Sequence, residues 1–260
     1  APIRVAPKRL ITTKTMAVKI TIAGLPIPAK VPEASGTFPY GAKRGSDPHS
    51  VRVDVQVDVA PLNEMAASPE FRLFTPDLSR YALYLTAYIA YLSRVSGDQV
   101  ISVGTPSHNR LSEQDRATLG LFVEVLPIEV AVSEEDSFRT LHEKVKAVLG
   151  TFLRSAKPGA VAAHEGAGFS NALNYIHAKF DSFAGGPMQV AWCHAGAHDA
   201  QHALRLHVTD FDGTGAAHLA LDVNAAVLSE VPAEDAAAHL GRFLDAAVAQ
   251  PDELLCGLLL

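Results

Sequence analysis

The stretch QVISVGTPSHNRLSEQDRATLGLFVEVLPIEV, which spans residues 99–130, decides the fold. It opens with a β-branched run that a Gly-Thr-Pro turn at 104–106 ends. The polar run 107–110 follows, and residues 111–118 are polar enough for one or two helical turns. Residues 119–132 are almost continuously apolar, which is typical of a strand buried on both faces. The stretch therefore predicts a polar loop held between two buried strands, where a rigid scaffold can aim its side chains.

Composition limits the class of protein. The 260 residues suffice for one large domain or two small ones, and 48% apolar with 19% charged residues is ordinary for a globular protein. A net charge of −6 gives no support to binding nucleic acid or an anionic membrane. No signal peptide and no membrane-spanning run is visible, so we expect a cytoplasmic location. The two cysteines, Cys193 and Cys256, show no metal spacing and are expected to be buried, reduced thiols.

The first 50 residues differ in composition from the rest. Residues 1–19 are basic, and residues 24–48 are rich in proline and glycine, which predicts a long extended connector. The expected organisation is therefore an N-terminal arm and connector over 1–50, followed by one domain over 51–260.

Hydrophobic periodicity predicts the elements of that domain. The run VRVDVQVDV at 51–59 alternates strictly and indicates a strand with one buried face. Residues 61–75 favour turns or a short helix. A helix over 76–97 carries a row of tyrosines, which we interpret as partly buried packing residues. Beyond the central stretch, the sequence predicts two more helices and four strands: helices at 137–155 and 232–249, and strands at 169–176, 188–194, 203–211 and 218–224.

These elements indicate an α/β (α+β) fold. Asp212 and Gly213 begin a short connection, so the last two strands are expected to pair as a hairpin. About seven strands and three long helices, with helices between some strands only, predict a mixed sheet with an antiparallel end and helices on one face. The apolar tail at 254–260 is expected to pack against this domain.

The order of motifs resembles a known family. A helix, VGTPSHNR, GLFVEVLPI, a helix that begins with DSF, and the strand FSNALNY follow one another as in the C-terminal half of a nonribosomal peptide synthetase condensation domain. The resemblance covers roughly residues 51–260. It implies the chloramphenicol acetyltransferase-like fold and the formation of amide or ester bonds between acyl and aminoacyl groups on carrier proteins.

The same resemblance implies partners that this sequence does not contain. The family's H-H-x-x-x-D-G signature lies on an N-terminal subdomain, and no His-His pair occurs here, so no catalytic residue is assigned. The family implies a peptidyl or acyl carrier protein whose phosphopantetheine arm tethers the substrate, and no directly bound cofactor. Glu124 and Glu129 stand where the family motif has asparagine and arginine.

Five residues are candidates for the wall of a substrate tunnel: Glu124, Asn171, Asn174, His108 and Arg110. A carboxylate in a buried strand is costly unless it is paired or lines a cavity, which makes Glu124 the best pointer. The asparagines lie three positions apart on one strand, so at most one faces the tunnel, where its amide can bond a pantetheine arm or an aminoacyl group. Both asparagines could instead satisfy backbone groups at an edge. Arg110 has a structural alternative, a pair with Asp115, which we favour over a carrier phosphate.

The histidines offer weaker alternatives. His177 has the family's spacing to Asp181, but Ile176 replaces the first histidine. His207 lies one residue too far from Asp212. His194, His198 and His202 are spaced for one helix face and a metal, yet a solvated loop suits the surrounding glycine and aspartate better, and no metal site is assigned.

Three functions stay open at this point. The chain is the C-terminal half of a condensation domain, inactive without the half that carries H-H-x-x-x-D-G. Alternatively, it is a degenerate relative that binds a carrier protein or recruits an enzyme without catalysis. A free-standing acyltransferase of the same superfamily is the least favoured. No hydrolase elbow, phosphate loop or dinucleotide fingerprint supports another class.

Overall fold

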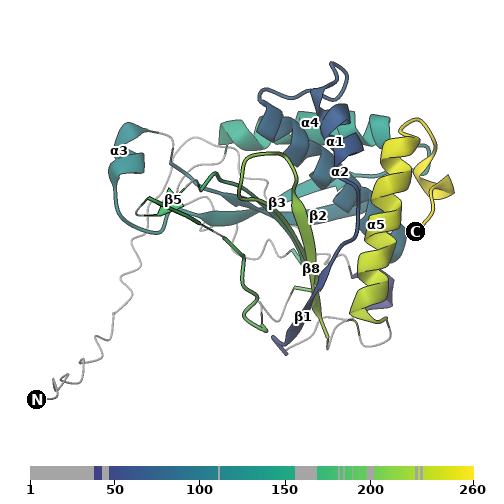
Figure 1. Ribbon diagram of the computed structural model, residues 1–260. Coiled ribbons are helices and arrows are strands. Elements are labelled where there is room, and N and C mark those ends of the chain that lie inside the picture. The colour runs from purple at the N-terminus through teal and green to yellow at the C-terminus, as the bar shows by residue number, and fades with distance from the viewer. Residues whose placement is uncertain are drawn as a thin grey trace, which may run out of the picture. The chain divides into compact units, whose positions relative to one another are not determined.

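A six-stranded mixed sheet is the centre of the fold in a computed structural model of the chain, which confirms the expected fold class (Figure 1). The structure describes residues 38–42, 47–110, 112–155, 169–180, 182–183, 185–188, 190–197, 202–225, 228 and 231–260. The sheet lies within the unit that runs from Val31 to Leu260.

The strands are not ordered as they occur in the sequence. Their spatial order is β1 (Ser50–Asp54), β8 (His218–Asn224), β7 (Leu204–Asp210), β4 (Asn171–His177), β2 (Val100–Ser107) and β3 (Glu124–Ala131). The central pairs β2–β4 and β4–β7 are parallel, and the outer pairs are antiparallel. The expected hairpin of the last two strands is confirmed, since β7 and β8 pair from Leu204↔Val223 to Thr209↔His218. A separate two-stranded ladder joins β5 (Ser182–Phe183) and β6 (Gly186–Pro187).

Helices pack against one face of the sheet. They are α1 (Ala60–Ala67), α2 (Pro76–Ser96), α4 (Phe138–Ser155) and α5 (Ala233–Ala249), with the short α3 (Glu113–Ala117) at the end of the sheet away from α5 (Figure 1). The helix α2 begins after Thr75, whose side chain accepts from the Leu78 backbone, and ends at Gly97 in the left-handed conformation, as its sequence predicts. Two 3-10 turns, η1 (Pro39–Gly41) and η3 (Leu255–Gly257), complete the described elements.

The tyrosines of α2 form the middle of the core. Tyr84, Tyr88 and Tyr91 are fully buried, which corrects the expectation of partly buried packing aromatics. Their burial follows from the position of α2, which is buried along most of its length among α1, α4, α5 and the sheet. The rings of Tyr88 and Tyr91 stack on each other, and the rings of Tyr81 and Tyr84 contact the ring of Tyr175 on β4.

Two predicted strands have different limits in the structure. The run 51–59 is a strand only as far as Asp54, after which the chain leaves β8 and turns into α1. By contrast, β2 continues through Gly104, Thr105 and Pro106, which were expected to end it. Pairing with β3 holds this segment extended as far as Ser107, so tertiary context overrides the local turn signal.

The apolar run 119–132 is not a strand buried on both faces. Only Glu124–Ala131 forms β3, which is the edge strand of the sheet. Leu119 and Leu121 lie before it and are 98% and 91% exposed. Apolar composition predicted burial, but no described element covers this segment.

Three further expectations, on the strand at 188–194, the two cysteines and the C-terminal tail, differ from the structure. The strand at 188–194 lies in part outside the described residues. The described part of 188–194 contains no strand. Cys193 and Cys256 are both exposed, because one lies in that irregular segment and the other in η3. The tail packs only in part, with Leu255 and Leu258 buried and Leu259 exposed.

Part of the proline-rich connector is packed. Tyr40 in η1 hydrogen-bonds through its hydroxyl to the Tyr91 hydroxyl at 3.0 Å and to Nδ1 of His239 at 2.7 Å. Residues 38–42 thus contact α2 and α5, although the sequence predicts an extended connector here.

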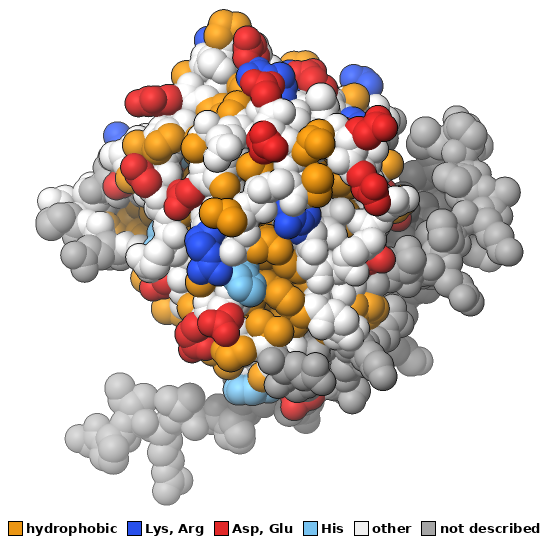
Figure 2. All heavy atoms as spheres, turned by 90° about the vertical axis from the view of Figure 1, so that its right-hand side faces the viewer, with side chains coloured by type: hydrophobic (Ala, Val, Ile, Leu, Met, Phe, Trp, Pro, Cys, Tyr) orange, Lys and Arg blue, Asp and Glu red, His pale blue; other side chains and the backbone are white. Residues whose placement is uncertain are grey.

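The surface of the described domain is mixed in charge. On the face that carries α5, acidic and basic side chains are interspersed with apolar ones, and the described side chains of this face show no broad basic patch (Figure 2). Among the described helices, none is long and apolar enough to cross a membrane.

Candidate functional site

A row of polar side chains crosses the face of the sheet that does not carry α1, α2, α4 and α5. Four adjacent strands contribute one residue each: Arg52 from β1, Asp222 from β8, His207 from β7 and Asn174 from β4. Alternation places them there, because their neighbours Val53, Leu221, Leu206 and Leu173 point into the helical layer.

Asp222 is the centre of this row. Its two carboxylate oxygens accept from Nε and Nη2 of Arg52 at 2.6 and 2.9 Å, and Oδ2 also accepts from Nε2 of His207 at 2.9 Å. Only 2% of Asp222 is exposed. Burial by itself would raise the pKa of this carboxyl, but the hydrogen bonds from His207 and Arg52 outweigh burial and hold the pKa well below its usual value.

This carboxylate fixes the imidazole of His207. Because an ionised carboxylate can only accept, Nε2 of His207 carries a proton, and Nδ1 accepts from the side-chain amide of Asn174 at 3.2 Å. The ring of Trp192 lies 6.2 Å from the imidazole, centroid to centroid, and the Trp192 carbonyl accepts from Arg52. With both nitrogens engaged, His207 positions Asn174 and has no free nitrogen to act as a base.

The amide of Asn174 is the end of the row on β4. Its Nδ2 donates to His207, while its Oδ1 makes no hydrogen bond to any described residue. Asn174 is half-buried, whereas Asn171 is fully buried on the opposite face of β4, where it donates to the Ser170 hydroxyl at 3.4 Å. The two asparagines therefore lie on opposite faces of β4, as their spacing predicts, and a tunnel beside either of them stays a prediction.

A second polar cluster lies at the β2–β3 connection and contains three of the five predicted residues. Its centre is Asn109, which is buried and has a φ of 52°, a backbone conformation that asparagine tolerates well. Nδ2 of Asn109 donates to Oε2 of Glu124 at 3.0 Å and to the Phe122 carbonyl at 3.1 Å. Oδ1 accepts from the Ser107 hydroxyl at 2.7 Å. Glu124 is thus paired, as its cost in a strand requires.

The predicted residues Arg110 and His108 hydrogen-bond to backbone groups of this loop and so stabilise its conformation. The guanidinium of Arg110 donates to the carbonyls of Asp115, Thr118 and Gly120, and it lies 4.2 Å from the ring centroid of Phe122. The structural alternative for Arg110 is supported, with the Asp115 carbonyl as its partner. His108 is exposed, and its Nδ1 accepts from the Arg110 backbone at 2.9 Å.

The remaining histidines do not form the arrangements considered from the sequence. His177 donates to Asp210 at 3.0 Å, and Asp181 lies outside the described residues. His194 donates to the Ser50 carbonyl, His202 stacks on Phe169, and His198 also lies outside the described residues. No group of three or more potential metal ligands exists within the described part of the chain.

Sequence reasoning missed Arg52, Asp222 and Asn109. The signal for Arg52 and Asp222 was a polar residue that alternates with the apolar side chains of its strand and so lies on the opposite face, in VRVDV and HLALDVN. Which polar positions meet depends on strand order and register, which no local pattern contains.

Comparisons with known proteins identify what the chain is similar to. Residues 75–160 match the family model of the condensation domain. Malpibaldin synthetase from Mortierella alpina is 30% identical over 128 residues, which is 49% of this chain and 2% of that protein. Surfactin synthase subunit 1 from Bacillus subtilis (strain 168) is 35% identical over 79 residues, 30% of this chain and 2% of that protein.

Solved structures show the same fold. The first condensation domain of the calcium-dependent antibiotic synthetase, in complex with a substrate analogue, aligns with a TM-score of 0.67 and 20% identity over 88% of this chain and 50% of that chain. The condensation domain from the monacolin K polyketide synthase gives a TM-score of 0.64 and 18% identity over 89% and 52%. The chain therefore spans about half the length of these solved domains.

Proposed function

We propose that this chain, which resembles the condensation domains of nonribosomal peptide synthetases and has their chloramphenicol acetyltransferase-like fold, is the C-terminal half of such a domain. The observation that carries the proposal is the half-length match, because 88% of this chain aligns with 50% of a condensation domain. The order of its motifs supports the C-terminal half. Its domain is residues 51–260, preceded by the arm and connector of 1–50.

In the proposed reaction, the amine of a carrier-bound aminoacyl group attacks the thioester carbonyl of a second carrier-bound acyl group. A C–N bond forms, the C–S bond breaks, and the thiol returns to the phosphopantetheine arm of the donor carrier. A hydroxyl nucleophile would give an ester in the same way. A base on the half that carries H-H-x-x-x-D-G would take the proton from the attacking amine. His207 is not that base, because both of its ring nitrogens are already hydrogen-bonded.

The residues of this chain would bind and orient the substrates. Oδ1 of Asn174 is an acceptor held in place through His207 and Asp222, and it suits an N–H of the amine or of a pantetheine amide. Glu124, His108 and Arg110 shape the neighbouring loop, and Asn171 supports β4 from the opposite face.

The exposed apolar segment supports a partner half. Leu119 and Leu121, followed by the half-exposed Val123, present large apolar side chains that a single soluble domain rarely leaves uncovered in series. We assign them as a contact for the N-terminal half, whether that half lies on the same polypeptide or on another.

The test is reconstitution. The purified chain is mixed with a separately expressed half that carries H-H-x-x-x-D-G and with two loaded carrier proteins, and mass spectrometry follows the condensed product. We expect no product from the chain alone and product from the mixture. Product from the chain alone, or failure of the halves to associate, would overturn the proposal.

Two variants separate association from substrate binding. Leu121→Ser should weaken association of the halves and leave turnover unchanged when the partner half is saturating. Asn174→Ala should leave association unchanged and lower turnover about tenfold, a loss within the range for one polar contact to a reacting group. Carrier binding without turnover by the assembled halves would favour the alternative, a degenerate domain that recruits without catalysis.

A further inference from the structure

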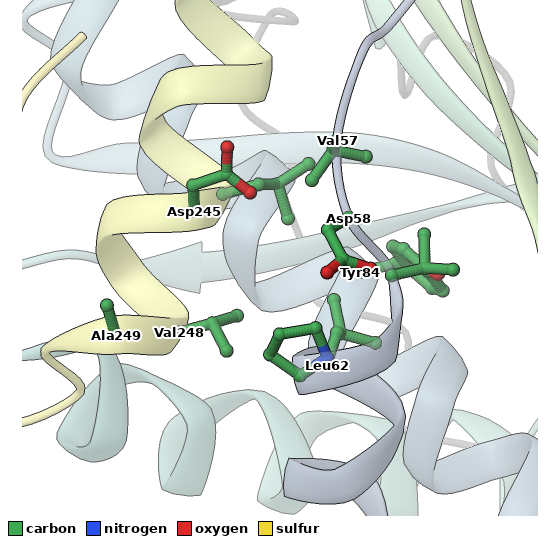
Figure 3. A pocket seen from close by; sticks show the side chains of 10 residues that line it. Val57, Asp58, Leu62, Tyr84, Asp245, Val248 and Ala249 are labelled. Atoms are coloured by element: carbon green, nitrogen blue, oxygen red, sulfur yellow. The ribbon is translucent and has the colours of Figure 1, made fainter.

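A pocket of about 220 Å³ lies in the helical layer, between α5 and the segment that leads from β1 into α1. Val57, Val59 and Leu62 line one side, and Leu244 and Val248 line the other. Figure 3 shows Asp245 and Val248 projecting from α5 toward Asp58 and Leu62. This pocket shares no residue with the polar row or the loop cluster described above.

Two carboxylates belong to this otherwise apolar pocket, from Asp58 and Asp245. Neither forms an ion pair with a described residue. The only described hydrogen bond of either side chain is the one that Asp58 Oδ1 accepts from the Ala60 backbone N–H at 3.0 Å. Burial raises the pKa of Asp245, and the nearby Asp58 carboxylate raises it further. Two like charges at one opening, next to apolar walls, form a site that a cation with an apolar body would complete.

The inner wall of the pocket is apolar. Tyr84 of α2 lines it and is only 1% exposed, and its ring packs against Tyr175 of β4. The pocket thus combines apolar walls with two carboxylates at its opening.

We propose that this pocket binds a small aliphatic amine, with its alkyl chain between α5 and the 57–62 segment and its ammonium group at Asp58 and Asp245. The volume is below the usual range for drug-sized ligands and suits a short alkyl chain. A divalent metal fits less well, because the described residues bring only two metal-ligating side chains together here.

The experiment uses n-butylammonium as the probe and the full chain as the protein. Backbone amide NMR signals are followed during titration, with 1-butanol as the uncharged probe of similar shape. We expect saturable shifts in the pocket residues at millimolar n-butylammonium, weaker binding of 1-butanol, and weaker amine binding at high salt. Absence of saturable shifts, or equal binding of 1-butanol, would overturn the proposal.

Variants locate the site. Replacing both pocket carboxylates, Asp58→Asn and Asp245→Asn together, should weaken amine binding about threefold to tenfold, as expected for two solvent-accessible ion pairs. Ala249→Trp places a large side chain at the exposed edge of the pocket and should abolish binding. Asp98→Asn, in the turn between α2 and β2, is the matched control and should change nothing. Unchanged binding in the first two variants would refute the assignment, and spectra of each variant show whether it is folded.

Discussion

The two faces of the sheet differ in how their buried polar groups are bonded. On the face without the main helices, the Asp222 carboxylate accepts hydrogen bonds from Arg52 and His207, so its buried charge is paired. In the helical layer, the hydroxyls of Tyr84 and Tyr88 have no described partner. There, His142 bonds only to the neutral groups of Thr86 and Phe71. The helical layer is therefore mainly apolar, with a buried carboxylate, Asp210, bonded to His177 at the end of β7, whereas the polar row on the other face depends on Asp222.

The largest effect should come from removing that carboxylate. Asp222→Ala leaves Arg52 and His207 without their shared acceptor, so we expect the free energy of unfolding to fall by about 3–5 kcal/mol. Urea denaturation measures the loss. The control is Asp54→Ala, whose carboxylate is exposed beside His218 and whose removal should cost under about 1 kcal/mol. Equal losses in the two variants would contradict the picture of one central acceptor.

Acid should weaken the helical layer through His142. Burial lowers the pKa of this imidazole from 6.5 to about 4 in the folded protein, so the folded state holds it neutral. The unfolded chain binds the proton more readily, and stability is therefore complete above about pH 6.5 and falls as the pH drops toward about 4. The loss attributable to this group is at most about 3 kcal/mol.

The measurement compares the wild-type chain with His142→Gln by denaturation at several pH values. The variant keeps a donor for the Phe71 carbonyl but cannot be protonated in this range. The gap in stability between the two proteins should narrow or reverse as the pH falls. A gap that stays constant from pH 7 to pH 4 would show that His142 does not titrate with folding.

A single methyl group tests how closely the helical layer is packed. A Cβ at Gly241 in α5 would lie 2.6 Å from the Gln56 carbonyl oxygen, so Gly241→Ala should destabilise the protein by about 1–3 kcal/mol despite the higher helix propensity of alanine. The matched control is Gly150→Ala in α4, where the nearest atom is 3.5 Å away and we expect a gain of about 0.5–1 kcal/mol. Thermal unfolding measures the change in stability of both variants. Changes of the same sign would contradict the close approach of α5 to the Gln56 carbonyl.

The smallest effect concerns the tyrosine hydroxyls. Tyr88→Phe removes a hydroxyl with no described partner and should be neutral or stabilising by up to about 1 kcal/mol. Tyr81→Phe removes a hydroxyl that bonds to Thr105 at 3.0 Å and should cost about 1 kcal/mol. Denaturation curves of the pair measure the difference, and a larger loss in Tyr88→Phe would mean that its hydroxyl is bonded after all.

Much of the fold could be predicted because its elements are encoded locally. The long helices and most strands follow from the repeat of apolar residues and from end signals such as Thr75 and Gly97. The sequence motifs also indicated the condensation-type fold, which the solved structures confirm. Of the candidate site, the sequence singles out Asn174, and the two-residue period of its strand predicts the opposite orientation of Asn171 that the structure shows.

The sequence by itself determined the periodic elements, the fold class and the polar positions, because neighbours along the chain set these features. Only the tertiary structure decided that β8 and β7 stand between β1 and β4, and therefore that Asp222 meets both Arg52 and His207. It also decided that Leu119 and Leu121 are exposed, although their composition predicts burial. Strand register and coverage depend on segments far apart in the chain, and no local pattern of residues contains that information.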